Sequence, residues 1–345
     1  MHTFYHAGHT RHDPAQLHRP DTPYTNIYYS EVARRGTIIY EAIKAADFGP
    51  ITLPGDFGFD AISEVHDHEM ITVLRTAYER TLREVGRQPA IPETFSVGRI
   101  PGHKLHSISG LLGYYCFDTS SPIFEHTWDV AYWSAQTALS AAALVLAGGE
   151  KVVYALCRPP GHHAASNLFG GFCYLNNAAI AANWLVQHGQ RVAILDIDYH
   201  HGNGTQAIFY GRSDVLVCSI HADPLQEYPF YWGFADEYGA GPGRNHNFNF
   251  PLPPGTGEPV YMAAYDEALS KIRLFVPDII LISLGVDTVE GDPVGGFKLT
   301  TATFSQLGAE VAALDRPAIV VQEGGYLLSS LGKNVVSFIR GLLGQ

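Results

Sequence analysis

Short apolar runs alternate with amphipathic stretches from about residue 127 onward. The apolar runs predict strands over Lys151–Cys157, Arg191–Asp198, Asp214–Ile220, Asp278–Gly285 and Arg316–Gln322. Helices are predicted over Trp128–Ala147, Asn177–His188 and Val260–Phe275, and again near the C-terminus. Runs that are apolar at every position indicate strands buried on both faces. Their alternation with helices therefore predicts a parallel sheet with right-handed crossovers.

The first 126 residues are less regular. Helical patterns occupy Ser30–Ala46 and Ala61–Val85, whereas Gly86–Gly113 is rich in Pro, Gly and Ser and predicts an excursion from the core. No internal repeat or low-complexity linker divides the chain. We therefore expect one α/β domain over residues 1–345, with a loop insertion at about 86–113.

Composition and charge narrow the class of protein. Hydrophobic residues make up 46% of the chain and charged residues 16%, which favours a large core over disorder. The net charge of −12 disfavours nucleic acid or an anionic membrane as the partner. The sequence has no apolar run of about 18 residues, no secretory signal pattern and no CxxC pair. We expect a cytoplasmic protein that binds neither nucleic acid nor membrane.

Polar residues and glycines follow four of the predicted strands. These segments are RPPGHHAA, DIDYHHGNG, VDTVEGDP and EGGY. Ligands of parallel sheets bind beyond the carboxyl ends of the strands. The four segments therefore predict a functional site at one edge of the sheet.

Two of these segments carry candidate metal ligands. Asp196, Asp198 and His200 alternate at a strand end and are predicted to project to one side. With Asp287 from another strand end, they suit an oxygen and nitrogen site that leaves room for water, as in catalytic zinc sites. The alternative is that the aspartates cap the next helix and that His200 is an ordinary surface residue.

The tandem His162 and His163 are candidates for acid and base catalysis. Alone they could form a polar loop, but imidazole beside a metal titrates in the range that proton transfer needs. A carboxylate or amide on the far ring nitrogen would fix each tautomer, and Asp196 and Asn203 are candidates for this. Tyr326, on a glycine-rich turn, could donate a hydrogen bond to an oxyanion, although most tyrosines only pack.

The motifs RPPGHHA, DIDYHHGNGTQ, SLGVDTVEGDP and QEGGY resemble, in order and spacing, those of the histone deacetylase superfamily. The resemblance is greatest to bacterial acetylpolyamine amidohydrolases and deacetylase-like amidohydrolases. It implies the arginase/deacetylase fold, a single three-layer α/β domain with an eight-stranded parallel sheet and helices on both faces. It also implies a zinc-dependent amidohydrolase that removes acetyl groups from acetylated aliphatic amines.

The resemblance assigns roles to individual positions of this chain. The implied zinc ligands are Asp198, His200 and Asp287. The implied catalytic residues are His163 as base and acid, His162 as its electrostatic partner paired with Asp196, Asn203 beside His163, and Tyr326 at the scissile carbonyl. A structural potassium ion would be held by Asp196, Asp198, His200, Ser219 and Ile220. The implied substrate tunnel contains Gly171, whose carbonyl receives the substrate amide, and the aromatic walls Phe172 and Tyr228.

One departure concerns the partner of His163. Where some members of the superfamily have HHGDG, this chain has Asn203. An amide orients the imidazole without adding a negative charge, so we expect His163 to be less basic than it would be beside an aspartate.

Two other classes of function remain to be weighed. Ureohydrolases of the same fold use two manganese ions, but the positions for the second metal are Gly202 and Val289, which supply no ligand. A catalytically silent binding protein would be expected to lack a ligand, the base or the tyrosine, and all are present. Hydrolysis of esters at the same metal site would be a side activity. Iron is an alternative to zinc, because it also binds oxygen and nitrogen ligands of this kind.

Substrate choice is the open question within the superfamily. Ser109, Ser120 and Val294 stand where some polyamine-specific members carry acids, and their absence weakens a preference for long polyamines. Asp118 and Glu125 remain as candidate amine contacts, and Asp118 could instead hold a peptide backbone, as in an acetyl-lysine deacetylase. The segment 86–113 resembles an insertion that forms a homodimer and narrows the entrance, which favours a small acetylated amine.

Overall fold

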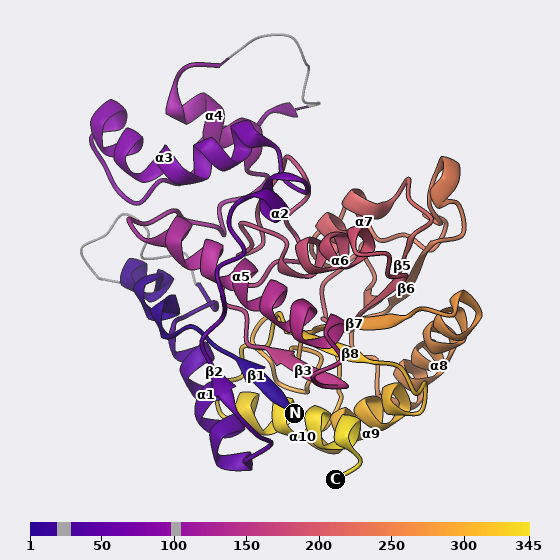
Figure 1. The fold of residues 1–345 in the computed structure, drawn as a ribbon. Helices are drawn as coiled ribbons and strands as arrows, with labels where there is room; N and C mark the ends of the chain where they lie inside the picture. The colour runs from indigo at the N-terminus through magenta and orange to yellow at the C-terminus, as the bar shows by residue number, and fades with distance from the viewer. Residues whose placement is uncertain (19–28, 98–104) are drawn as a thin grey trace.

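The strands of the protein form one parallel sheet with the five predicted strands at its centre. The computed structural model describes residues 1–18, 29–97 and 105–345 (Figure 1). The sheet order is β2-β1-β3-β8-β7-β4-β5-β6, and every described pairing is parallel. The strands are β1 His2–Phe4, β2 Ile51–Thr52, β3 Val152–Ala155, β4 Val192–Asp196, β5 Val215–Ala222, β6 Asn247–Leu252, β7 Ile279–Leu284 and β8 Ala318–Gln322. The predicted fold class is confirmed.

Helices cover both faces of the sheet. They are α1 Arg34–Ala46, α2 Asp60–Ser63, α3 His68–Val85, α4 Ile108–Tyr115, α5 Thr127–Leu146, α6 Asn177–Gln187, α7 Asn203–Phe209, α8 Glu258–Phe275, α9 Thr301–Ala312 and α10 Leu331–Leu343. Alternate residues of β4 point into two separate cores. Ile194 packs in the core that includes α5 and α6, whereas Leu195 packs in the core that includes α8, α9 and α10. Burial on both faces explains why the strand is apolar throughout.

The N-terminal third differs from its sequence prediction in two places. The single helix predicted over Ala61–Val85 is wrong, because α2 and α3 are separate and Asp67 caps α3 by accepting the Glu69 and Met70 amides. The intervening His66 is buried and its Nδ1 lies 2.9 Å from the Ala165 carbonyl, which draws the chain out of the helical path.

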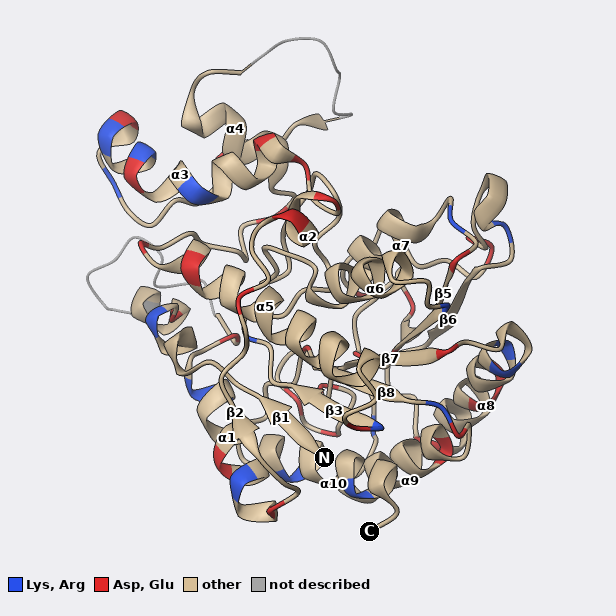
Figure 2. Ribbon diagram, viewed as in Figure 1, with Lys and Arg blue, Asp and Glu red and all other residues tan. Residues whose placement is uncertain are grey.

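The predicted insertion is not a loop throughout. Its last part belongs to α4, whose Ile108 and Leu112 are buried against the core, while residues 98–104 lie outside the described part of the chain. The neighbouring α3 buries its apolar face and leaves Arg75 and Glu79 exposed. Figure 2 shows both positive and negative residues along this helix. Among the described residues, no helix has the length and apolar character that a membrane span requires.

A buried ionic cluster fastens the N-terminal segment to the sheet. Glu31 accepts hydrogen bonds from Arg158 Nε at 2.7 Å and from Arg35 Nη1 at 3.0 Å. Arg158 follows β3, and Arg35 lies on α1 and donates through Nε to the Gly325 carbonyl beyond β8 at 2.6 Å. Both arginines and Glu31 are buried, so each charge depends on the others for its solvation.

Replacement of Glu31 tests this cluster. We expect Glu31→Gln to lower the free energy of unfolding by about 3–5 kcal/mol, because it leaves two buried guanidinium groups without their carboxylate. Urea denaturation followed by circular dichroism measures the change. The control is Asp315→Asn, which breaks an exposed ion pair with Lys151 and should leave the midpoint unchanged. Equal midpoints for both variants would contradict the proposed importance of the buried cluster.

Candidate active site

The candidate site lies where four adjacent strands end. His162 and His163 follow β3, Tyr326 follows β8, Asp287 follows β7, and Asp198 with His200 follows β4. These strands are neighbours in the order β3-β8-β7-β4. Since the carboxyl ends of parallel strands meet at one edge of the sheet, the four motifs converge there.

Asp198, His200 and Asp287 form a compact group of possible metal ligands. One ligand atom from each lies within 4.8 Å of the others. His200 Nδ1 lies 3.2 Å from Asp198 Oδ1 and 3.3 Å from Asp287 Oδ2. Gly324 makes this approach possible, because a Cβ there would lie 2.4 Å from Asp287 Oδ2 and 2.5 Å from Asp198 Oδ2.

The electrostatics of this group suit a cation. Burial lowers the pKa of His200, but hydrogen bonds and charges from Asp198 and Asp287 outweigh burial and raise it to about 10. Burial and the neighbouring Asp198 charge raise the pKa of Asp287 to about 7. Asp287 Oδ2 is buried and faces His200 Nδ1 at 3.3 Å. Two crowded carboxylates and one imidazole nitrogen are the donor set of an open zinc site, so the residues fit the metal.

The two tandem histidines have different partners and different proton affinities. His162 Nδ1 lies 3.0 Å from Asp196 Oδ2, and His163 Nδ1 lies 2.7 Å from Asn203 Oδ1. Burial lowers the pKa of His162, but the charges of Asp198 and Asp196 raise it to about 10. Burial and the nearby His162 charge hold the pKa of His163 well below its usual value. One ring is therefore charged while the other is neutral and able to accept a proton.

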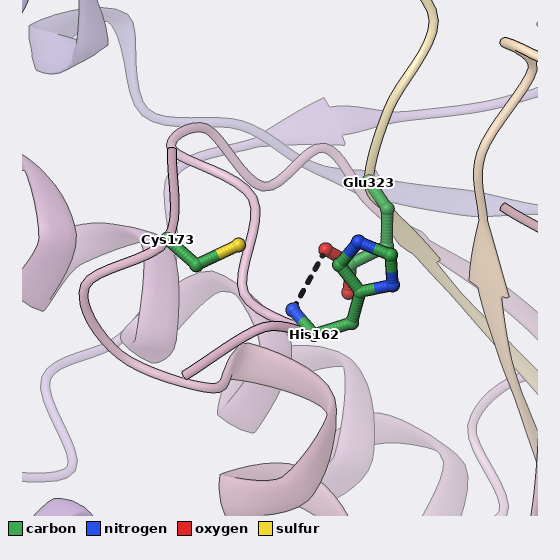
Figure 3. A group of neighbouring side chains, drawn as sticks. All are labelled: His162, Cys173 and Glu323. Carbon is green, nitrogen blue, oxygen red and sulfur yellow. Dashed lines mark hydrogen bonds between the residues drawn. The ribbon is translucent and has the colours of Figure 1, made fainter. Parts of the chain in front are cut away.

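A second buried group of side chains supports the loop that carries His162 and His163. His162, Cys173 and Glu323 each place a ligand-type atom within 4.8 Å of the others. Glu323 Oε2 accepts the Gly161 amide at 2.7 Å and the His162 amide at 3.2 Å, and Figure 3 shows the Cys173 sulfur pointing toward the same carboxylate. Burial and the Glu323 charge raise the pKa of Cys173 well above its usual value, so the thiol stays protonated. This geometry indicates that Glu323 positions the loop backbone.

A cavity of about 330 Å³ leads to these groups. Its lining residues are Asp118, Ser120, His163, Gly171, Phe172, His200, Glu227, Tyr228, Phe230, Val294 and Tyr326. The predicted tunnel residues Gly171, Phe172 and Tyr228 all line it. Glu125 is exposed and is not among the described lining residues. It lies near Tyr78, whose pKa is raised first by burial and then by the charge of Glu125.

Asp118 holds two walls of this cavity together. Its Oδ2 accepts hydrogen bonds from the Gly171 amide at 3.0 Å and from the Tyr228 hydroxyl at 2.8 Å. Ser120 donates to the same carboxylate through its amide at 2.9 Å and its hydroxyl at 2.7 Å. Four hydrogen bonds from Gly171, Tyr228 and Ser120 therefore engage the Asp118 side chain.

Tyr326 is held by a residue that the sequence analysis did not single out. Asp292 Oδ2 accepts the Tyr326 amide at 2.7 Å and the Leu327 amide at 2.8 Å. The ring of Tyr326 lies 5.7 Å from the Phe172 ring, and the Arg35 guanidinium lies 4.5 Å from its centroid. Asp292 stands in the VDTVEGDP motif, but no local pattern marks it as a residue that binds the backbone of another strand end.

The five residues of the implied potassium site lie along β4, β5 and the turn beyond β4. Asp196 and Ser219 are register partners in these strands, and Ile220 follows Ser219. Asp198 and His200 belong to the turn. The Ser219 hydroxyl also lies 2.8 Å from His221 Nδ1.

Comparisons with known proteins place the chain in a family. The histone deacetylase domain matches residues 29–342. An acetylpolyamine amidohydrolase of Burkholderia pseudomallei is 44% identical over 340 residues, covering 96% of this chain and 97% of that protein. Acetylpolyamine amidohydrolase 1 of Pseudomonas aeruginosa is 42% identical over 322 residues, covering 91% of each.

Solved structures agree with the sequence comparisons. The crystal structure of the acetylpolyamine aminohydrolase from Burkholderia pseudomallei superposes with a TM-score of 0.90 at 41% identity, over 99% of this chain and 98% of that one. The HDA15 HD domain gives a TM-score of 0.82 at 27% identity, over 100% of this chain and 91% of that one. The chain therefore belongs to the histone deacetylase family, whose members are metal-dependent hydrolases of non-peptide amide bonds.

Proposed function

We propose that this protein removes the acetyl group from small acetylated amines, such as acetylated diamines and polyamines, and releases acetate and the free amine. The observation that carries the proposal is the convergence of a metal-ligand group, a neutral and a charged histidine, and a tyrosine at a cavity with two acidic residues in its wall. The relatives named acetylpolyamine amidohydrolase, which match almost the whole chain, support the choice of substrate.

Asp198, His200 and Asp287 would hold one zinc ion, which would supply Lewis acidity to the acetyl carbonyl and to the attacking water. His163 Nδ1 donates to Asn203, so its Nε2 is free to take a proton from the attacking water. The Tyr326 hydroxyl donates to the carbonyl oxygen as negative charge develops, and burial keeps that phenol protonated by raising its pKa. His163 Nε2 then returns its proton to the leaving amine.

Neighbouring residues would orient the substrate and support these groups. The Gly171 carbonyl would accept the substrate N–H, and its φ of 58° turns the backbone at the cavity wall. Phe172 and Tyr228 would flank the acyl chain as aromatic walls. His162, charged through Asp196, would stabilise negative charge beside the base. A potassium ion at Asp196, Asp198, His200, Ser219 and Ile220 would neutralise further buried oxygens.

We also propose a single domain in which the segment 86–113 mediates a cytoplasmic homodimer. Its described part exposes apolar side chains, with Val97 91% exposed and Phe95 and Leu105 each 40% exposed. Apolar groups this accessible favour contact with a second chain.

Substrate preference tests the proposed function. We expect the zinc-loaded protein to favour acetylputrescine over an acetyl-lysine tripeptide by at least about tenfold in kcat/KM, or about 1.4 kcal/mol. Acetate release gives the rate. Tyr326→Phe is the control and should lower kcat by about 100-fold while zinc content stays the same. Preference for the tripeptide would instead make the protein a peptide deacetylase.

The partner of His163 sets the acidic limb of the pH profile. Asn203→Asp adds a negative charge at 2.7 Å from Nδ1 and should raise the pKa of His163. The base then stays protonated to higher pH, so the acidic limb of kcat/KM should shift upward by about one pH unit. Asn203→Ala, which removes the bond without adding charge, should show no such shift. An unchanged limb in the aspartate variant would exclude His163 as the titrating base.

A further inference from the structure

The cavity wall contains two carboxylates, and only one of them is available to a ligand. Asp118 and Glu227 line the cavity, and no Lys or Arg is among its described lining residues. We propose that Glu227, assisted by the ring of Phe230, binds the free ammonium group at the far end of an acetylated diamine. The inference rests on the proposed function and names the part of the substrate that this chain selects.

Asp118 is a poor candidate for this role because its oxygens already accept four hydrogen bonds. These come from Gly171, Tyr228 and, twice, Ser120. An ammonium group that bound there would compete with the donors that fix two walls of the cavity. Asp118 is therefore a positioning residue.

Glu227 has fewer partners than Asp118. Its carboxylate lies beside the Tyr199 hydroxyl, and the pKa of Tyr199 is raised first by burial and then by the charge of Glu227 and a hydrogen bond to it. No Lys or Arg is among the described residues that line the cavity around this carboxylate. Glu227 thus lies beside the turn that carries the metal ligands, in the wall of the cavity, with one neutral hydroxyl beside it and no cation among the described lining residues.

A tight turn presents Glu227 and Phe230 on the same wall. The Phe230 amide donates to the Glu227 carbonyl at 3.1 Å, and Glu227, Tyr228 and Phe230 all line the cavity. Phe230 has a φ of 64°, which is costly for an aromatic residue and marks a conformation that the turn imposes. The residue as a whole is 48% exposed. A carboxylate and an accessible aromatic face together favour an organic cation.

The remaining wall residues explain why the role falls to Glu227. Ser120 and Val294 line the same cavity and are uncharged. The recognition of a cationic substrate in this chain therefore depends on an acid from a different loop. Glu227 lies in the loop after β5, and no sequence motif marks it.

A pair of substrates with and without the terminal ammonium group tests the inference. We compare acetylputrescine with N-butylacetamide, its uncharged analogue of similar length, in the zinc-loaded wild type and in Glu227→Gln. The ratio of the two kcat/KM values, charged over neutral, should fall about tenfold in the variant. The control is Asp236→Asn, which removes one exposed negative charge outside the cavity lining and should leave the ratio as in the wild type.

Ionic strength gives a second readout that does not depend on the variant folding. The wild-type ratio should fall when salt is raised from about 50 to about 500 mM, because added ions screen the attraction between the carboxylate and the ammonium group. An equal ratio in wild type and Glu227→Gln, or no salt effect in the wild type, would overturn the role of Glu227 while leaving the deacetylase intact. No turnover of either substrate by the wild type would overturn the proposed function and this inference with it.

Discussion

Repulsion between two buried carboxylates is the constraint around which this site is built. Asp198 and Asp287 come from different strand ends, and both face His200 Nδ1 at 3.2–3.3 Å. Backbone amides hold them there, since Gly324 donates to Asp198 and Tyr199 donates to Asp287. These amides and the imidazole offset part of the negative charge of the two buried carboxylates. A cation at this point stabilises charges that the fold otherwise keeps together at a cost.

The support for this centre comes from groups distant in sequence. Glu323 holds the histidine loop by its backbone, and Asp292 holds the Tyr326 turn in the same way. Glu31 joins Arg158, just beyond β3, to Arg35, which reaches the carbonyls beyond β8. Buried carboxyl groups that accept backbone amides fix the loops more firmly than packing alone, because any displacement leaves buried polar groups without a partner. The chemistry therefore depends on residues that never touch the substrate.

The sequence predicted the centre of the sheet well, and the structure brings the candidate site residues together at the strand ends, for physical reasons. Five strands are apolar throughout because they are buried on both faces, and polar motifs at their ends marked the site. The short edge strands gave no such signal: β2 has two residues, and β6 alternates between buried and partly exposed positions. The contacts of Asp118 with Gly171 and Tyr228 span 53 and 110 residues, and that of Glu31 with Arg158 spans 127. No local pattern encodes pairings of that kind, so Glu323, Asp292 and Glu227 became recognisable only in the folded chain.

The most direct test of the account is a stoichiometric metal titration. Zinc would be added to metal-free protein in steps of a fraction of an equivalent, and acetate release from acetylputrescine would be measured at each step. Activity that rises linearly and reaches its plateau at one zinc per chain is the result that a single Asp198–His200–Asp287 centre predicts. A plateau at two equivalents, or full activity before any metal is added, would contradict it.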